Sequence, residues 1–423
     1  MISQPSLLVV HHFFHPDDVV SAREYSDLAQ EHVRRGWRVT VLTGNRSYAN
    51  PREALPRTET WRGIKIIRSY RPPWSQAGAL PRLANSAWLT SSWLLEALKA
   101  GPFDAIVIGS EPAFAPLLVL PLKALWPEAR FVHWCFDMYP EAIEAEGLGR
   151  LAGVLVPLAR RMMRSAYRRY DSLVDIGPRM AERLRAYGAE ARQMTLVPWA
   201  LVEPTKPLDP SPPVRASLFP RARLGLLYSG TMGRAHEYEL LLELARRCRA
   251  RSGDKVSLCF SCRGNRLDQL RSAITAADTN ISLAPFCSEA DLALRLGAAD
   301  LHAISLKAQW SGIVVPSKFF GSLAAGKPVI YAGSPDSDIA RWIDALDVGF
   351  VLSRETLDTA VDRLHQLLDD DRLLRMWSQK AFDAYRTHFS KHAVTDAWAS
   401  LLRSVVDADS VNGAHDVRPL SIR

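Results

Sequence analysis

The sequence predicts an α/β protein of two domains, each a doubly wound parallel sheet, with the two sheets facing each other across a cleft. Three observations favour this fold class. The chain has 423 residues, more than one ordinary domain, and 48% of them are hydrophobic. Buried apolar runs alternate with helical patterns in both halves, and a proline-rich segment separates the halves. Such sheets bind ligands at the carboxyl ends of their strands.

The first domain is predicted to span residues 1–203. A continuous apolar run at residues 7–12 predicts a strand, and Ser21-Ala-Arg-Glu24 has the spacing of a capping box at the start of a helix. Gly36 ends this helix, and residues 37–43 form a second buried strand, which completes a βαβ unit. Further strands are expected at residues 103–109, 130–137 and 173–176.

Residues 204–220 are predicted to be a linker without regular structure, because prolines recur there with no helical or strand period. The second domain, residues 221–390, repeats the alternation. Its strands are expected at 224–229, 256–262, 281–286 and 300–306, and its helices at about 237–251, 267–277 and 289–296. Residues 391–423 are predicted to be a C-terminal helix, packing back on the first domain, and a tail.

Residues 310–333 combine a polar loop, a short helix and a buried strand, and this combination is typical of a phosphate site. Ser317 is expected to cap the helix, and Lys318 in its first turn places a cation beside the free backbone N–H groups. Gly326 is expected to end the helix and Pro328 to start the strand.

The net charge of +8 and the pI near 9.3 suit an anionic ligand or an acidic membrane surface. No nucleic-acid reader motif is present, so no nucleic-acid partner is expected. Five cysteines and the absence of a secretory leader indicate the cytoplasm. Cys259 and Cys262 have CxxC spacing, but they fall in a strand where they face opposite ways, so buried, unligated thiols are expected. No apolar run reaches the roughly 20 residues of a membrane-spanning helix.

Several motifs occur in an order that identifies a family. They are Tyr228-Ser-Gly-Thr-Met-Gly-Arg-Ala-His236, Val315-Pro-Ser-Lys318, Leu323-Ala-Ala-Gly-Lys-Pro-Val-Ile330 and Asp137-Met-Tyr-Pro-Glu141. Together they resemble the GT-B glycosyltransferases of family 4, and most of all the bacterial surface-polysaccharide enzymes with a Pro-Ser-Lys motif. The resemblance covers nearly the whole chain, since residues 36–43 and 175–184 also match in order.

The resemblance implies retaining transfer of a sugar from a nucleoside diphosphate sugar, such as a UDP-sugar, with no metal or other cofactor. The second domain would hold the donor, and the first would hold a glycan, lipid-linked or small-molecule acceptor. The chain departs from the wider family at Ile313 and Gly321, where two glutamates are usual, and at Thr231 and His236, near positions that often carry an arginine and a lysine.

Candidate site residues follow from these motifs. The catalytic candidates are Asp137, Glu141 and Lys318. The donor-binding candidates are Gly230, Thr231, Met232, Arg234, His236, Arg263, Phe286, Gly312, Val314, Val315, Pro316, Ser317 and Lys318. The acceptor-binding candidates are His15, Asp17 and Asp18 in the first loop.

Each candidate has a structural alternative. Asp137, at the end of a strand, has two functional interpretations, in which it accepts the proton of the acceptor hydroxyl or stabilises positive charge on the sugar. In the structural interpretation it only caps the following turn. The histidines at 11, 12 and 15 resemble a metal cluster, but no matching ligands recur, so no metal is expected. Asp336-Ser-Asp338 mimics a DxD motif at a helix start, where aspartates favour the dipole anyway.

Residues 150–169 form a basic amphipathic stretch. It either lies on an anionic membrane leaflet, at the inner face, or packs on the first sheet with a solvated basic face. Trp74, Trp88 and Trp93 are possible interfacial anchors for the first reading.

Two other classes of function stay open. A nucleotide-sugar 2-epimerase would share the fold and would turn over the nucleotide sugar without an acceptor. A non-catalytic protein would bind the nucleotide sugar and release nothing, and Ile313 and Gly321 make it a serious alternative.

Overall fold

The computed structural model describes residues 4–48, 50, 52–72, 74, 79–147 and 149–407. These form two compact units. The first contains the chain up to Val197 together with the segment that starts at Val394, and the second runs from Pro198 to Ala393.

The first unit contains an eight-stranded sheet in the order β3-β4-β2-β1-β5-β6-β7-β8. All pairs are parallel except β3 with β4. Its central strands are buried along their whole length, as expected of strands covered on both faces. The strands are β1 Ser6–Val10, β2 Arg38–Gly44, β3 Thr58–Trp61, β4 Ile64–Ser69, β5 Ala105–Gly109, β6 Arg130–Trp134, β7 Ser172–Asp175 and β8 Arg192–Thr195.

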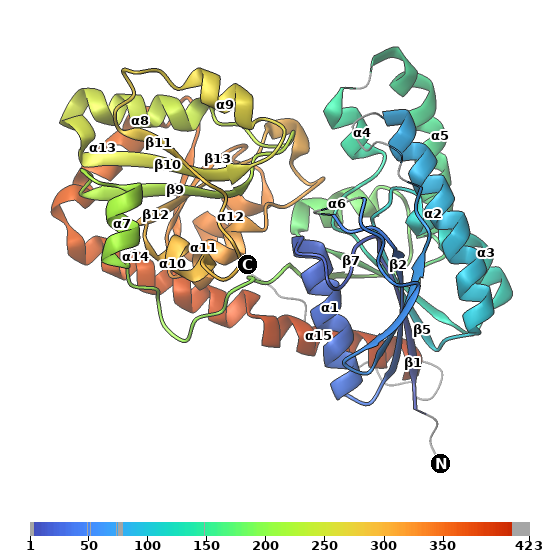
Figure 1. Cartoon of the computed structure of the whole chain (residues 1–423). Coiled ribbons are helices and arrows are strands. Elements are labelled where there is room, and N and C mark those ends of the chain that lie inside the picture. Colours follow the sequence, from blue (N-terminus) through green and yellow to red (C-terminus); the bar gives the residue numbers. More distant parts are fainter. Residues whose placement is uncertain are drawn as a thin grey trace. The chain divides into compact units, whose positions relative to one another are not determined.

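Helices cover both faces of this sheet (Figure 1). Neighbouring residues of β6 show the two faces, because His133 packs against Tyr167 and Tyr170 while Trp134 packs against Tyr25 and Trp398. The helices are α1 Val20–Arg34, α2 Ala79–Ala100, η1 Ala115–Leu118, α3 Val119–Leu125, α4 Glu141–Glu146, α5 Gly149–Tyr167 and α6 Pro178–Arg185.

The capping box predicted at Ser21 is wrong. Helix α1 begins at Val20, its N-cap is Val19, and no side chain caps it. Glu24 is fully buried on the inner face of the helix, so its carboxylate does not reach back to the first turn. The antiparallel pair β3 and β4 was not predicted, because β3 is largely exposed and lacks a continuous apolar run.

The second unit contains a six-stranded, wholly parallel sheet in the order β11-β10-β9-β12-β13-β14. Its strands are β9 Leu224–Thr231, β10 Val256–Arg263, β11 Ile281–Ala284, β12 Leu301–Ser305, β13 Val329–Ala332 and β14 Gly349–Leu352. Its helices are α7 Pro212–Leu218, α8 Glu239–Ser252, η2 Gly253–Lys255, α9 Leu267–Ala273, α10 Leu292–Gly297, η3 Ala308–Trp310, α11 Lys318–Ala324, α12 Asp338–Leu346, α13 Leu357–Asp369, α14 Asp371–Ala384 and η4 Tyr385–Phe389.

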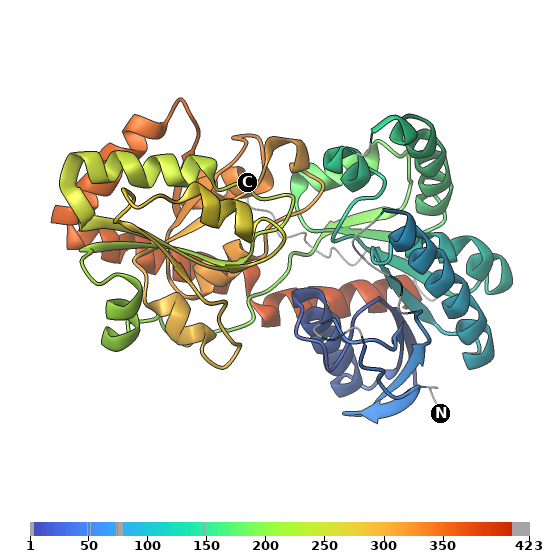
Figure 2. The ribbon, with the colours of Figure 1, turned by 45° about the horizontal axis from the view of Figure 1, so that its top comes forward.

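Helices cover both faces of this sheet (Figures 1 and 2). Alternate residues of β9 pack into two cores on these faces. Leu226 and Tyr228 pack with α8 and α13 in the larger core, and Leu227 packs beneath α7 in the smaller one. Cys262 belongs to the larger core and Cys259 to the smaller, as the strand alternation predicts. All five cysteines are buried and free.

The linker prediction is wrong in one part, because residues 212–218 form helix α7. Pro212 and Pro213 occupy its first turn, where proline has no N–H to lose and its fixed φ suits a helix. Leu218 and Phe219 then pack on Leu227 and Cys259. Proline therefore started a helix here instead of preventing one.

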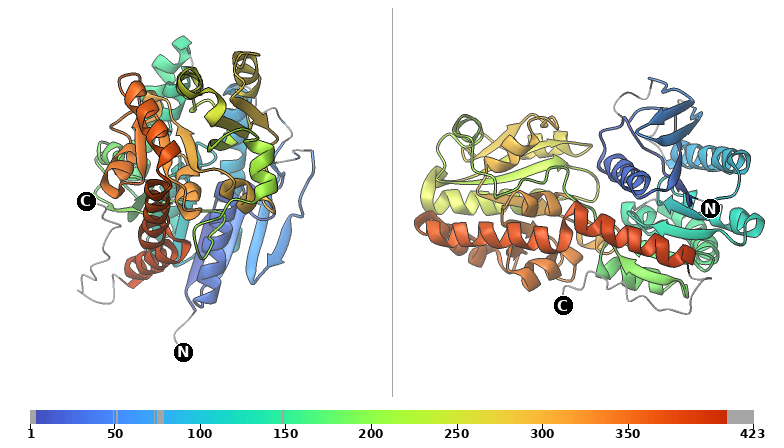
Figure 3. Two further views of the ribbon diagram at one scale, coloured as in Figure 1. Left: turned by 90° about the vertical axis from the view of Figure 1, so that its left-hand side faces the viewer. Right: turned by 90° about the horizontal axis from the view of Figure 1, so that it is seen from below.

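Helix α15, Lys391–Val406, belongs to the first unit from Val394 onward. It lies beside α1 (Figures 1 and 3), and Asp396 forms an ion pair with Arg35 at the end of α1. Trp398 is fully buried, with its ring centroid 4.8 Å from that of Trp134. In the part of the chain that the structure describes, no helix is long and apolar enough to cross a membrane.

We predict that Trp398→Ala destabilises the chain by about 3–5 kcal/mol, because it leaves a large cavity against Trp134. Chemical denaturation measures the change. Ser400→Ala, on the exposed face of the same helix, is the control and should change stability by about 0.5 kcal/mol at most. Equal stability of both variants would contradict the packing of α15 described above.

Candidate functional site

The Lys318 side chain is the centre of a polar cluster in the second unit. It extends from the first residue of α11 to the end of β9, where its Nζ donates to the carbonyl of Thr231 at 2.9 Å. The same Nζ lies 3.3 Å from Nε2 of His236 and 5.2 Å from the ring centroid of Tyr228. A single segment, residues 228–236, therefore holds the ammonium group of a lysine that lies 87 residues beyond Thr231.

His236 supports this ammonium as a neutral acceptor. Its Nδ1 lies 2.6 Å from the carbonyl of Ser305, at the end of β12, so Nδ1 carries the proton and Nε2 is left to accept from Lys318. Burial, and then the charge of Lys318, lower the pKa of His236 to about 3. The imidazole is therefore uncharged at neutral pH.

No carboxylate among the described residues pairs with the ammonium of Lys318. Burial lowers its pKa to about 8, which still leaves it mostly charged at neutral pH. Within the described residues, its contacts are a carbonyl, an imidazole and an aromatic face, and none of these is an anion. Such a cation is suited to bind an anionic ligand such as a phosphate.

The glycine at position 230 is needed for this arrangement. Its φ of +129° lies in the region that favours glycine, and a Cβ there would come within 2.8 Å of Cε of Lys318. Nearby, the amide of Met232 donates to the carbonyl of Arg263 at 2.6 Å. This hydrogen bond occupies the backbone N–H of Met232, a predicted donor-binding residue, so that amide is used within the fold.

Two further donor candidates form a stacked pair. The guanidinium of Arg263, at the end of β10, lies 4.1 Å from the ring centroid of Phe286, which follows β11 and is 41% exposed. A flat, cationic and partly exposed surface of this kind can stack a planar group. Arg234 is exposed in the loop between β9 and His236, and Thr231 is exposed at the end of β9.

The loop before α11 shapes the site mainly through its backbone. Gly312 has a φ of +71°, and the amide of Ile313 donates to the carbonyl of Trp310 at 3.0 Å. Ile313 is buried, as are Gly312, Val315 and Pro316, while Val314 and Ser317 are half-buried. Ser317 is the N-cap residue, but its side chain makes no capping bond, contrary to our expectation.

A carboxyl pair lies at the carboxyl edge of the first sheet. Asp137 follows β6 and Glu111 follows β5, and the amides of Phe136 and Asp137 both donate to Oγ of Ser110. Burial raises the pKa of Asp137, and burial together with the charge of Asp137 raises the pKa of Glu111. Buried carboxyls whose charges influence one another are typical of sites that move protons.

The sequence reasoning missed Glu111, although the rule that identified Asp137 applies to it equally. Both residues come directly after a buried strand, so both lie at the ligand-binding edge. Ser305 was also missed as a partner of His236, because the contact uses a backbone carbonyl and leaves no signal in the side chains.

In the described part of the chain, the hydrogen-bond partners of the Glu141 side chain are Tyr187 and Arg160, and neither Asp137 nor Glu111 is among them. It begins α4, and its Oε1 accepts from the hydroxyl of Tyr187 at 2.5 Å and from Nε of Arg160 at 3.4 Å. These contacts join α4 to α5 and to the turn after α6. They favour a structural role, and the predicted catalytic role stays untested.

The first-loop candidates differ in exposure. His15 stacks on Trp61 at 4.0 Å, and its carbonyl accepts from Arg68. Asp17 is buried and accepts the amide of Tyr48 at 2.7 Å, and burial raises its pKa. Asp18 is exposed. Asp18 and the half-buried His15 are thus the more accessible of the three.

Within the described residues, no three histidine, cysteine or acidic side chains are grouped as a metal would require. Asp338, in the DxD-like sequence, is buried in the first turn of α12, where Ser337 caps the helix by accepting the amide of Ala340. That contact gives the motif a structural explanation.

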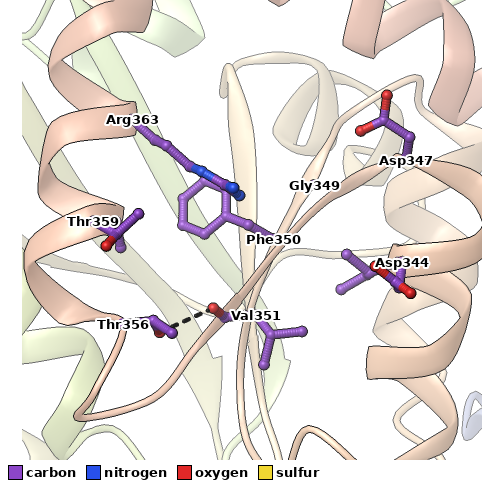
Figure 4. Close-up of a pocket in the computed structure, with 10 residues that line it drawn as sticks. Asp344, Asp347, Gly349, Phe350, Val351, Thr356, Thr359 and Arg363 are labelled. Atoms are coloured by element: carbon purple, nitrogen blue, oxygen red, sulfur yellow. Dashed lines mark hydrogen bonds between the residues drawn. The ribbon is translucent and has the colours of Figure 1, made fainter.

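A separate cavity of about 340 Å³ lies along the edge strand β14 (Figure 4). Helices α12 and α13 contribute residues to its lining, and the hydroxyl of Thr356 donates to the carbonyl of Val351 in its wall. None of the predicted site residues lines it.

Comparisons with known proteins agree with these features. Residues 21–200 match the sequence model of the glycosyl transferase 4-like domain. A relative in Pseudomonas aeruginosa, the probable glycosyltransferase WbjE, is 24% identical over 253 residues, which are 58% of this chain and 62% of WbjE. The match thus spans less than two thirds of that relative.

Solved glycosyltransferases share the fold. WaaG, involved in lipopolysaccharide biosynthesis, superposes with a TM-score of 0.60 at 15% identity, covering 96% of this chain and all of WaaG. Anabaena Alr3699/HepE in complex with UDP-glucose superposes with a TM-score of 0.64 at 13% sequence identity, covering 94% of this chain and 99% of HepE. The predicted fold class, two Rossmann-like domains of the GT-B type, is confirmed.

We predict that Lys318→Met weakens the binding of inorganic diphosphate to the whole chain at least tenfold, because it removes the unpaired ammonium. Calorimetric titration measures the affinity. Lys380→Met is the control, since Lys380 belongs to the same unit and is paired with Asp347 at the surface. If both variants lose affinity equally, the binding reflects overall charge and not this cluster.

Proposed function

We propose that this protein is a retaining glycosyltransferase that moves a sugar from a UDP-sugar to a glycan or lipid-linked acceptor during surface-polysaccharide synthesis. The observation that carries the proposal is the ammonium of Lys318, which Thr231 and His236 hold and which pairs with no carboxylate in the described ranges of the chain. The match to the glycosyl transferase 4-like domain and the UDP-glucose complex of a structural neighbour support it.

In this proposal the second unit binds the donor. As the bond from the sugar to the diphosphate breaks, negative charge develops on the β-phosphate, and Lys318 stabilises it. Arg234 adds a second cation from its exposed loop, and the Arg263 and Phe286 pair stacks the base. Because the protein's own cations neutralise the leaving group, the proposal requires no divalent metal.

The first unit supplies proton transfer. The ionised partner of the Asp137 and Glu111 pair accepts the proton of the attacking acceptor hydroxyl, and the raised pKa values of the pair bring it close to neutrality. The reaction thus joins the acceptor oxygen to the sugar, releases UDP, and leaves the proton on a carboxyl. We infer retention of configuration from the family resemblance.

A cytoplasmic site at the inner membrane face fits the exposed surface of α5. Leu158 and Met162 are 57% and 41% exposed beside the exposed Arg161 and Arg164. Such a surface suits the headgroup region of an anionic leaflet and hence a lipid-linked acceptor. Of the proposed anchors, Trp74 and Trp88 are exposed, whereas Trp93 is buried and therefore serves the core.

Product analysis separates an epimerase from a glycosyltransferase. Transfer to a glycan, a lipid-linked acceptor or a small molecule gives acceptor-dependent release of UDP in each case. An epimerase would use the Asp137 and Glu111 pair as its acid and base, and would convert the UDP-sugar without an acceptor. Incubation with UDP-, GDP- and ADP-sugars, with and without p-nitrophenyl glycosides as acceptors, tests the proposal. Nucleotide binding with no turnover under either condition would contradict it.

We predict that Asp137→Asn lowers kcat of the transfer reaction about 10²–10⁴-fold with little change in KM for the donor, because it removes the base and leaves the donor site intact. Wild-type kcat should fall as the pH falls through the raised pKa of the pair, because a protonated carboxyl can no longer act as the base. Steady-state assays from pH 5 to 8 measure both effects.

Glu128→Gln is the matched control, because Glu128 is an exposed carboxylate of the same unit in the turn before β6, at the opposite edge of the sheet. It should keep wild-type kcat. An unchanged kcat in Asp137→Asn would remove Asp137 from the mechanism.

A further inference from the structure

Arg71 is a buried arginine without a counter-ion. It lies two residues after β4, at the carboxyl edge of the first sheet, and is 4% exposed. Its Nε–H is buried and has no hydrogen-bond partner, and its one side-chain hydrogen bond is a long contact of 3.4 Å from Nη1 to Nε2 of His12. No ion pair joins Arg71 to any carboxylate within the described part of the chain.

Its neighbourhood adds positive charge. Nε of Arg46 donates to the carbonyl of Arg71 at 2.7 Å, and the charge of Arg46, after burial, lowers the pKa of Arg71. Asp17 opposes this effect at a distance, but its Oδ1 is engaged by the amide of Tyr48. A guanidinium stays protonated in proteins, so Arg71 is a charge that the fold leaves uncompensated.

Arg68, on β4 itself, is by contrast an arginine that serves the structure, although its Nε, like that of Arg71, is buried without a partner. It is 2% exposed, and Glu59 forms an ion pair with its Nη1 at 2.8 Å. The carbonyls of Pro56 and His15 accept from its two terminal nitrogens at 3.2 and 2.8 Å. Two arginines three residues apart are therefore buried alike, and only one of them is neutralised.

We propose that Arg71, with Arg46 and His12 beside it, binds an anionic group of the acceptor, either the carboxylate of an acidic sugar or the phosphate of a phosphorylated one. The inference rests on the proposed function, because it takes the anionic ligand to be the acceptor of the transfer reaction. A guanidinium can bind either group through two parallel N–H donors. The ligand then supplies the counter-charge that the fold omits.

The position of Arg71 fits an extended acceptor. The strand order β4-β2-β1-β5 places the end of β4 three spacings from the end of β5, which carries Glu111. Three spacings are roughly 14 Å. The charged group would therefore lie on the acceptor away from the hydroxyl that reacts, and it would select the acceptor without taking part in the chemistry.

The test measures binding of glucuronic acid, glucose 6-phosphate and glucose to the whole chain by calorimetry, in a Lys318→Met background that disables the diphosphate site. We expect at least one charged sugar to bind tenfold or more tightly than glucose, and Arg71→Gln to abolish that preference. The charged sugar that binds more tightly shows whether the site prefers a carboxylate or a phosphate. Arg57→Gln, which removes a 73% exposed arginine of the same unit, should keep the preference.

A stability measurement separates this role from a structural one. Arg71→Gln removes an uncompensated charge, so without ligand its Tm should equal or exceed that of the parent. If Arg71→Gln does not fold, Arg71→Lys carries the test, and it should weaken the charged sugars but not glucose. Equal binding of glucose and the charged sugars, or an unchanged preference in the Arg71 variants, would overturn the inference.

The outcome is independent of the proposed reaction, because no donor and no transfer enter the measurement. A chain that fails to release UDP from any UDP-sugar but binds an anionic sugar through Arg71 would lose the proposed function and keep the anion site. A chain that transfers sugar but shows no preference for charged sugars would keep the proposed function and lose the anion site.

Discussion

The hydrogen-bond chain from Ser305 through His236 to Lys318 is the interaction on which the proposed donor site depends. It fixes the tautomer of the imidazole, directs Nε2 at the ammonium, and holds the ammonium above Gly230. Each member comes from the carboxyl end of β9 or β12 or from α11, which begins just beyond them. The parallel sheet therefore builds the cluster, because it brings these chain ends to one edge.

The two units have opposite local chemistry at their sheet edges. The second carries cations, in Lys318, Arg234 and the Arg263 and Phe286 pair, and the first carries the carboxyls of Asp137 and Glu111. A reaction that expels a diphosphate and removes a proton from a hydroxyl needs both kinds of group. Burial lowers the pKa of Lys318 and raises the pKa values of Asp137 and Glu111, so it brings these three groups closer to neutrality.

The sequence predicted most of the parallel strands, because their continuous apolar runs and flanking glycines are local signals. It also selected Lys318 and Asp137 as candidates, since a residue at the end of a buried strand or the start of the next helix lies at the ligand edge. It failed where tertiary packing decided the outcome, as with the unused cap at Ser317, the helix at residues 212–218 and the exposed strand β3. The missing counter-ion of Arg71 has no sequence signal, because Arg68 and Arg71 differ only in their three-dimensional neighbours.

The most direct test of the account is an NMR titration of the Lys318 ammonium, with the side-chain carbon beside Nζ as the probe, in the absence and presence of saturating UDP. Without ligand, the pKa should lie near 8, because burial disfavours the charge. With UDP bound, the account predicts a clear rise in this pKa, since the diphosphate supplies the missing anion. An unchanged pKa of Lys318 when UDP is bound would contradict the claim that this ammonium holds the diphosphate.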